Sequence, residues 1–248
     1  MTAHAVTLPR PSLPRLASVE LRKAADTRAG FWLLLVTVLL SAALVTVQLI
    51  WGEAADKHLF PLFQTTLEIT AFILPILGIL LVTSEWSQRT GLTTFALVPQ
   101  RERVIAAKVI GACVLMLGAV VACLAIASFA NVIGGGDWNL GLGELGRGTL
   151  YELIQVLLGV AFGLVFLNSA LAIVMSFALP ISWAILGGTI KVLDKPADWL
   201  DISRPLETLV GGGPMTGTDW AQLATAVGVW VGVLFAIGLV RLRNAELK

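Results

Sequence analysis

Long apolar segments alternate with shorter polar segments along this chain. Six apolar segments come close to or exceed the ~20 residues that a helix needs to cross a hydrocarbon core of ~30 Å. They are residues 31–51, 60–83, 104–133, 150–167, 170–188 and 221–240. Lipid offers no hydrogen-bond partners to an open strand, so the pattern predicts an all-α, polytopic membrane protein with six transmembrane helices.

The fourth and fifth apolar segments form one run that only Asn168 and Ser169 interrupt. A continuous helix over this run would be ~58 Å long, about twice the thickness of the hydrocarbon core. Asn and Ser favour turns and helix caps because their side chains bond to nearby backbone groups. We therefore expect a tight hairpin at these two residues.

Composition supports a membrane location and limits the candidate chemistry. Hydrophobic residues make up 57% of 248 positions, charged residues 13%, and the mean hydropathy is +0.87. A net charge of +1 gives no support to a nucleic-acid partner. The two histidines, His4 and His58, cannot build a histidine metal cluster or a catalytic triad, and no Gly-x-x-x-x-Gly-Lys-Ser/Thr phosphate loop is present. Cys113 and Cys123 lie ~15 Å apart along one expected helix, too far for a disulfide.

The distribution of Lys and Arg predicts the orientation of the spans. If the N-terminus is cytosolic, the inside segments hold twelve Lys and Arg residues and the outside segments hold five. Cytoplasmic segments of membrane proteins carry such an excess of Lys and Arg. We therefore expect both termini in the cytoplasm.

Two different segments precede the first span. Residues 1–15 contain three prolines and are expected to form a disordered lead-in to a transmembrane domain that covers residues 16–248. Residues 16–28 repeat apolar residues at helical spacing, which predicts an N-terminal amphipathic helix at the inner membrane interface. The side chains expected on or near one side of it are Leu21, Ala24, Ala25 and Arg28. A simple basic anchor before the first span is the alternative.

A polar stretch, residues 84–103, joins the second and third spans, and several loose motifs lie in it and around it. The motifs are Glu20-Leu21-Arg22-Lys23, Glu85, Arg89-Thr90-Gly91-Leu92-Thr93, Pro99, Arg101, Lys108, the short turn between the fourth and fifth spans, the long outer segment before the last span, and the basic ending from Arg241 to Leu247. In this order they resemble the permease subunits of type 2 ATP-binding-cassette exporters. The likeness covers nearly the whole chain after residue 16, and it depends on the order of the motifs rather than on any one of them.

The resemblance implies a division of labour between this chain and its partners. Two permease subunits, identical or related, would pair in the bilayer of a bacterial plasma membrane as multi-pass proteins. Separate cytosolic ATPase subunits would dock beneath them and hold the ATP and Mg. The chain itself would then bind no cofactor and would not be an enzyme.

By the same resemblance, the segment from Glu85 to Leu97 corresponds to the coupling helix that sits in a groove of the ATPase. Its residue types suit such a contact, with polar and charged groups, two apolar anchors and a glycine that permits a bend. In that order, these are Glu85, Gln88 and Arg89, then Trp86 and Phe95, then Gly91. The alternative is an ordinary inside loop that is polar because it is wet.

The longest outer segment, residues 189–219, precedes the last span. Its apolar residues between Pro196 and Val210 predict one short helix at the outer interface. The resemblance implies a re-entrant lid or gate over the exit. An interfacial connector with Trp199 at the level of the headgroups is the alternative.

Polar residues within the spans are costly in lipid, so each suggests a role. They are Gln48, Thr65, Thr66, Glu68, Thr70, Asn131 and Gln155. Glu68 either faces a transport path or reaches the outer headgroups. Pro75 is expected to kink the second span or to serve packing alone.

By likeness to the family, large apolar residues of the second and fifth spans line the substrate cavity. They are Phe72, Leu74, Met175 and Phe177; with Glu68 and Pro75, the substrate path is predicted at Glu68, Phe72, Pro75, Met175 and Phe177. The pairs Gly159-x-x-x-Gly163 and Gly228-x-x-x-Gly232 are expected to pack helices within one subunit, with subunit pairing as the less favoured alternative.

The function expected from these features is export of a small amphiphilic or apolar compound, such as a drug, an antibiotic, a lipid-like molecule or a peptide. Alternating access powered by the separate ATPase would drive it. The alternative is an ATPase-independent secondary carrier or channel, against which we note no acid or base at the centre of the membrane. A membrane anchor or assembly factor is a third class.

Overall fold

The computed structural model describes residues 12–87 and 101–244, and within these ranges the chain is helical and has no strands. Six helices are long and apolar enough to cross a membrane, which confirms the expectation of an all-α protein with six candidate spans. They are α2 (Arg28–Trp51), α3 (Leu59–Ser87), α5 (Arg101–Gly134), α6 (Leu142–Phe166), α7 (Ser169–Thr189) and the continuous helix made of α10 (Gly217–Val227), a π-helical segment η2 (Gly228–Val233) and α11 (Leu234–Asn244).

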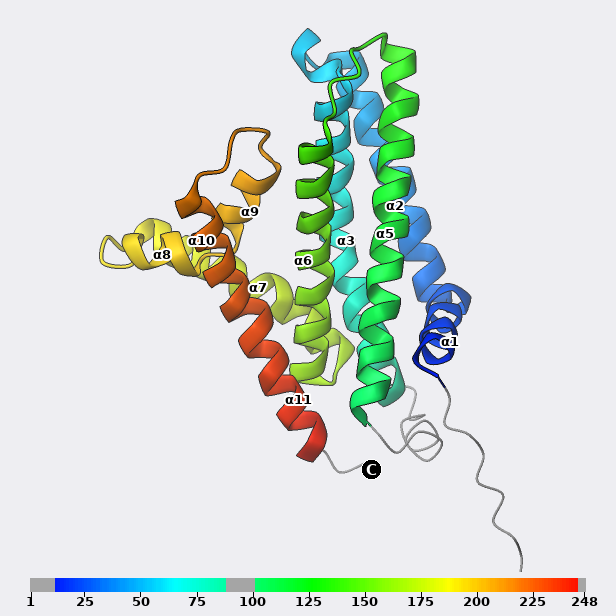
Figure 1. Cartoon of the computed structure of the whole chain (residues 1–248), viewed down its shortest axis with the longest axis vertical. Helices are drawn as coiled ribbons and strands as arrows, with labels where there is room; N and C mark the ends of the chain where they lie inside the picture. The colour runs from blue at the N-terminus through cyan, green and yellow to red at the C-terminus, as the bar shows by residue number, and fades with distance from the viewer. Residues whose placement is uncertain (1–11, 88–100, 245–248) are drawn as a thin grey trace, which may run out of the picture.

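The long helices run side by side, and their two ends differ (Figure 1). The loop end, as we call it, holds the end of α3, the start of α5 and the end of α11. The far end holds the connections at residues 52–58 and 135–141. The helix α7 and the continuous helix α10–α11 lean away from the long helices on the side of α6. Both ends of the described chain therefore lie near the loop end.

Four shorter helices complete the described chain. They are α1 (Leu13–Asp26), a 3₁₀ turn η1 (Ala54–Lys57), α8 (Asp194–Leu200) and α9 (Ser203–Val210). The single short helix expected across 196–210 is wrong, because α8 ends at Leu200 and a second helix follows. The Asp201 carboxylate accepts a hydrogen bond from the Ser203 N–H at 2.9 Å, which fixes the turn between the two.

Helix α1 also differs from its prediction at its C-terminal end. It ends at Asp26, and Thr27 caps the next helix by accepting a hydrogen bond from the Gly30 N–H at 3.2 Å. Arg28 therefore belongs to α2. The residues that α1 buries are Ala17 and Glu20, while Leu21 and Ala24 are half-buried.

The turn between α6 and α7 lies where the sequence placed it. Leu167 adopts a left-handed conformation with φ of 50°, and the Asn168 side chain accepts a hydrogen bond from the Leu171 N–H at 3.0 Å. At its other end, α6 begins at Leu142, earlier than the apolar segment suggested. The Glu144 carboxylate accepts from the Gly141 N–H at 2.8 Å and so caps this polar extension.

Glycines bring the backbones of α3 and α6 into contact. A Cβ atom on Gly78 would lie 2.7 Å from the Val156 carbonyl oxygen, and one on Gly159 would overlap the Pro75 carbonyl group. One on Gly163 would lie 3.1 Å from the Val82 Cβ atom. The first glycine pair therefore packs helices within one subunit, as expected.

The second glycine pair, Gly228 and Gly232, makes no close helix contact within the described chain. Neither Gly228 nor Gly232 has a heavy atom of another part of the described chain within 4 Å of its Cβ position. The expectation that this pair packs helices within the subunit was therefore wrong for the described residues. The pair lies in the π-helical segment instead, where Trp230 donates a hydrogen bond from Nε1 to the Leu200 carbonyl at 2.7 Å and ties the last span to α8.

Candidate functional site

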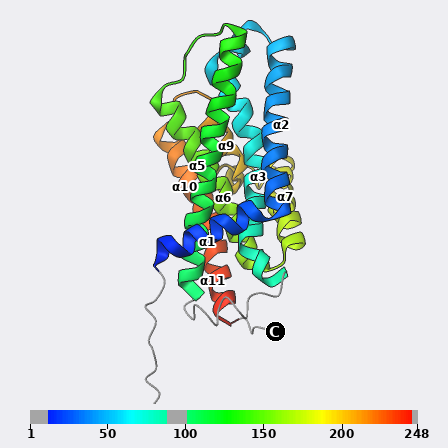
Figure 2. The same ribbon diagram turned by 90° about the vertical axis from the view of Figure 1, so that its right-hand side faces the viewer.

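Helix α1 crosses the long helices near the loop end (Figure 2), and a buried ion cluster joins it to α3 and α5 there. Two members, Glu20 and Lys23, come from α1, while Glu85 comes from the last turns of α3 and Lys108 from the first turns of α5. The Lys108 side chain has no exposed surface, and Glu85 and Glu20 retain only 2% and 6%. Lys23 closes the cluster on its solvent side, since its side chain is about half exposed.

Lys108 is the centre of this cluster. Its Nζ atom lies 2.7 Å from Glu20 Oε2 and 3.4 Å from Glu85 Oε1, and it donates a third contact to the Leu81 carbonyl at 2.8 Å. Lys23 Nζ lies 2.7 Å from Glu20 Oε1 and 3.5 Å from Glu85 Oε1. Each lysine therefore joins the carboxylate of α1 to the carboxylate of α3.

Local sequence explains how α1 reaches this position. Glu20 and Lys23 are three residues apart and thus share one face of their helix. Small residues line the crossing, since Ala17 is buried and a Cβ atom on Gly111 of α5 would be only 3.7 Å from the Glu20 Cβ atom. A Cβ atom at position 111 would be in ordinary van der Waals contact, whereas a side chain longer than that of alanine would push α1 away from α5.

The charges of the cluster balance, because two lysines face two carboxylates. Burial alone would raise the pKa of Glu20, but the charge and hydrogen bond of Lys108, together with those of Lys23, hold it below its ordinary value. Burial alone would lower the pKa of Lys23, yet the hydrogen bond and charge of Glu20, together with Glu85, raise it. The charged forms of Glu20 and Lys23 therefore stabilise the packing of α1 against α3 and α5, and that packing in turn favours the charged forms.

Glu85 is not fully satisfied by this arrangement. Only its Oε1 atom contacts the lysines, and its buried Oε2 atom has no hydrogen-bond partner among residues 12–87 and 101–244. A buried carboxylate oxygen without a donor is costly. Among the described residues, this carboxylate thus has one acceptor position without a donor.

The structure describes two of the six predicted coupling residues. Glu85 belongs to the ion cluster, and Trp86 lies in the last turn of α3. The remaining four, Gln88, Arg89, Gly91 and Phe95, lie outside the described residues. The sequence offered Lys108 only as one motif of the family resemblance, and the structure adds that its side chain is fully buried. Its position among apolar residues of the third span was the signal for burial.

The predicted substrate-path residues fall into two groups. Phe72 on α3 is 64% exposed, and its ring stacks on that of Phe177 on α7 with centroids 4.8 Å apart. Glu68 is exposed on α3 and Met175 is half-buried on α7. Pro75 is buried instead, against Gly159 of α6. Its position agrees with the packing alternative for this proline.

One interior acid escaped the sequence analysis. Glu152 lies ten residues into α6, and its side chain has no exposed surface. Neither carboxylate oxygen has a hydrogen-bond partner within the part of the chain that the structure describes. The expectation of no acid or base at the centre of the membrane did not take this buried residue into account. Glu152 was overlooked because it stands only two residues inside the expected start of its span.

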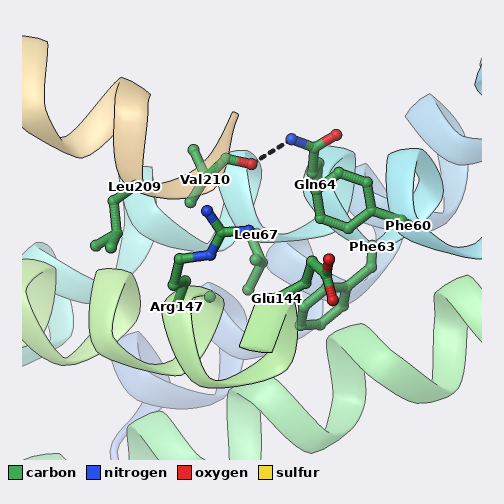
Figure 3. A pocket seen from close by; sticks show the side chains of 9 residues that line it. Phe60, Phe63, Gln64, Leu67, Glu144, Arg147, Leu209 and Val210 are labelled. Atoms are coloured by element: carbon green, nitrogen blue, oxygen red, sulfur yellow. Dashed lines mark hydrogen bonds between the residues drawn. The ribbon is translucent and has the colours of Figure 1, made fainter. Parts of the chain in front are cut away.

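A crevice opens beside the first turns of α3 and α6 (Figure 3). Apolar side chains form its floor, whereas Gln64, Glu144 and Arg147 bring polar groups to it. Gln64 donates from Nε2 to the Val210 carbonyl, at the end of α9. The lining residues are Phe60, Phe63, Gln64, Leu67, Glu144, Arg147, Gly148, Leu209 and Val210.

Residues 194–213, which we call the α8–α9 segment, are held to the bundle from several sides. Besides the Gln64 and Trp230 contacts, Arg147 donates from Nη1 to the Gly213 carbonyl at 2.6 Å. Within the segment, Arg204 pairs with the carboxylates of Asp194, Asp198 and Asp201. Leu206 and Leu209 of α9 are buried in an apolar cluster with residues of α6.

Comparison with known proteins adds no name to these features. No protein-family model matches the chain, and no curated protein matches it. Functional inference therefore depends on the residues described above.

Proposed function

We propose that this chain is the membrane subunit of an ATP-driven exporter, in which the loop end faces the cytosol and receives force from a separate ATPase. The ion cluster carries the proposal. Glu85 and Lys108 lie on the two helices that flank the 88–100 connection, and both contact Glu20 of α1 directly or through Lys23. A displacement of that connection would reach α1 and two spans together.

Because the ion cluster is buried, the contacts that join α1, α3 and α5 resist separation. Separating a buried ion pair leaves uncompensated charge away from water, which costs about 3–5 kcal/mol. Motion of the α3 end therefore takes α5 and α1 with it rather than breaking the cluster. An ordinary wet loop does not need such an anchor at its base, and this favours the coupling role over that alternative.

The remaining components of the proposal follow from the same assignment. ATP and Mg would be held by cytosolic ATPase subunits, so this chain would bind no cofactor and catalyse no reaction. A second membrane subunit, a copy or a relative, would complete the assembly in a bacterial plasma membrane. The exposed apolar pair Phe72 and Phe177 suits a small amphiphilic or apolar cargo. In this assignment the α8–α9 segment is the exit lid.

The experiment compares two carboxylate-to-amide variants in the assembly purified with its ATPase. Glu85→Gln removes a charge from the ion cluster, whereas Glu102→Gln removes one from an exposed pair with Arg243, 2.5 Å apart, at the same end of the bundle. Cargo moved per ATP hydrolysed is expected to fall in Glu85→Gln and to stay unchanged in Glu102→Gln. Equal ratios in both variants, or purification of the chain without any ATPase, would contradict the proposal.

An ATPase-independent carrier is the second candidate, and Glu152 favours it, because buried acids in membrane proteins are commonly part of ion pathways. The two candidates make opposite predictions in sealed vesicles. The exporter needs ATP and the partner ATPase for accumulation of cargo. The carrier needs only an ion gradient, so transport by this chain alone under a pH gradient would select it.

A further inference from the structure

We propose that Glu152 binds a proton in the interior of the bundle and exchanges it with water through the crevice at Gly148. The inference does not depend on the ATPase assignment. It concerns a group that the coupling mechanism does not use, and its ligand is the proton itself.

Burial without partners is the first support. Both carboxylate oxygens of Glu152 lack a hydrogen-bond partner among the described residues, and its side chain has no exposed surface. An ionised carboxylate in that environment would lose its hydration without gaining a donor or a counter-ion. A protonated carboxyl group is neutral and avoids most of this cost.

The charged neighbours do not supply a counter-ion. Among the cations on elements packed against α6, Arg204 of α9 pairs with acids of α8, Arg241 of α11 donates to the Val165 carbonyl, and Arg243 pairs with Glu102. Arg147 of α6 itself donates to the Gly213 carbonyl. On α5, Lys108 pairs with Glu20 at the loop end, and Arg101 and Arg103 stand in the first turn of that helix, ~30 Å along its axis from Cys123. The remaining ionisable groups on α3, α5, α6 and α9 are carboxyl groups, the thiols of Cys113 and Cys123 and the Tyr151 hydroxyl, and none is a cation at neutral pH.

A route to water is the second support. Gly148 lies four residues before Glu152, which is one helical turn, and it belongs to the lining of the crevice in Figure 3. Leu67 and Phe63 close the floor at this point, since a Cβ atom on Gly148 would lie 2.7 Å from Leu67 Cδ1 and 3.0 Å from Phe63 Cε1. Leu67 and Phe63 therefore line the crevice beside Gly148, one helical turn before the acid.

Infrared spectroscopy of the full chain in lipid nanodiscs tests proton binding. At neutral pH we expect a carboxylic-acid C=O band that disappears in Glu152→Gln and persists in Glu144→Gln, whose acid caps α6 at the exposed far end. Because Gln is the closest neutral mimic of the protonated acid, the Glu152→Gln variant is also expected to keep wild-type thermal stability. An unchanged band in Glu152→Gln, or failure of that variant to fold, would overturn the proposal.

The rate at which the same band shifts after transfer to D₂O tests the route. Leu67→Ala opens the floor of the crevice and is expected to accelerate the shift several-fold. Leu77→Ala is the matched control, because Leu77 is also a buried leucine of α3 but lies nearer the loop end. Equal rates in the two variants would refute exchange through the crevice.

Discussion

Lys108 illustrates at the scale of a single residue what a buried charge requires. Its ammonium group has three donors, and the structure supplies the carboxylates of Glu20 and Glu85 and the carbonyl of Leu81 as acceptors. Its partners come from α1 and α3, so satisfaction of this one side chain requires three helices to be in place. A buried pair of this kind is fully formed only in the folded protein.

Substitution of Lys108 should therefore be costly in a specific way. We expect Lys108→Met to lower the free energy of unfolding by about 3–5 kcal/mol, because it leaves Glu20 and Glu85 buried with one lysine fewer. Thermal denaturation in detergent measures the loss. Adding Glu20→Gln to this variant should restore part of it, whereas simple additivity of the two substitutions would contradict the direct coupling.

The lowered pKa of Glu20 predicts how stability depends on pH. A carboxyl group whose pKa is lower in the folded state stabilises the protein above its ordinary pKa of 4.5, and this contribution is lost as the pH falls through the lowered value. We expect the melting temperature of the wild type to drop in this acidic range. Glu20→Gln should melt lower at neutral pH and change less on acidification, and parallel profiles would argue against the assignment.

At the scale of elements, the contact of α3 with α6 depends on residues that have almost no side chain. At Gly78 and at Gly159, backbone atoms of the facing helix occupy the space that a Cβ atom would need. Pro75 adds to this close contact, since its carbonyl and Cα atoms lie directly against Gly159. Helices in lipid associate through such close packing because the hydrophobic effect does not separate them from the acyl chains.

The two glycine pairs give a matched test of this contact. Gly159→Ala places a Cβ atom 2.5 Å from the Pro75 Cα atom and should destabilise the fold by about 1–3 kcal/mol through overpacking. Gly232→Ala meets open space and should leave the melting temperature unchanged or slightly raised. Similar losses in both variants would show that the α3–α6 contact is looser than described.

Element type and number were accessible from the sequence because apolar length alone identifies a span in lipid. Boundaries were less accessible: α6 starts at Leu142 because Glu144 caps a polar turn, and hydropathy carries no information on caps. The ion cluster was seen only as scattered motif residues, since which face of α1 meets α5 depends on Gly111 and Ala17. The burial of Lys108 and of Glu152 was not predicted for the same reason: composition does not reveal which side chains lose all contact with water.

At the scale of the whole molecule, the two ends of the bundle are chemically different. The loop end carries α1, the ion cluster and the basic turn with Arg241 and Arg243, whereas the far end carries η1 and the start of α6. The difference makes the orientation in the membrane testable from outside the cell.

Accessibility of engineered thiols measures that orientation. In intact cells, a membrane-impermeant maleimide should label Gly143→Cys at the far end and leave Asn244→Cys at the loop end unlabelled until the membrane is opened. The native thiols contribute little background, because Cys123 is buried and Cys113 is half-buried in α5. The reverse labelling pattern would place the coupling segment outside and remove the basis for an ATPase partner.

The π-helical segment at Gly228–Val233 sets the phase of the last span. Each residue advances an α-helix by ~100°, so one additional residue would ordinarily rotate everything after it. A π-helical turn takes up that residue by widening, and Trp230 accordingly points at the Leu200 carbonyl while Gly238, further along, presses against Leu164 of α6. Deleting one residue here should replace the wide turn with an α-helical turn and keep both contacts, whereas adding one should separate them.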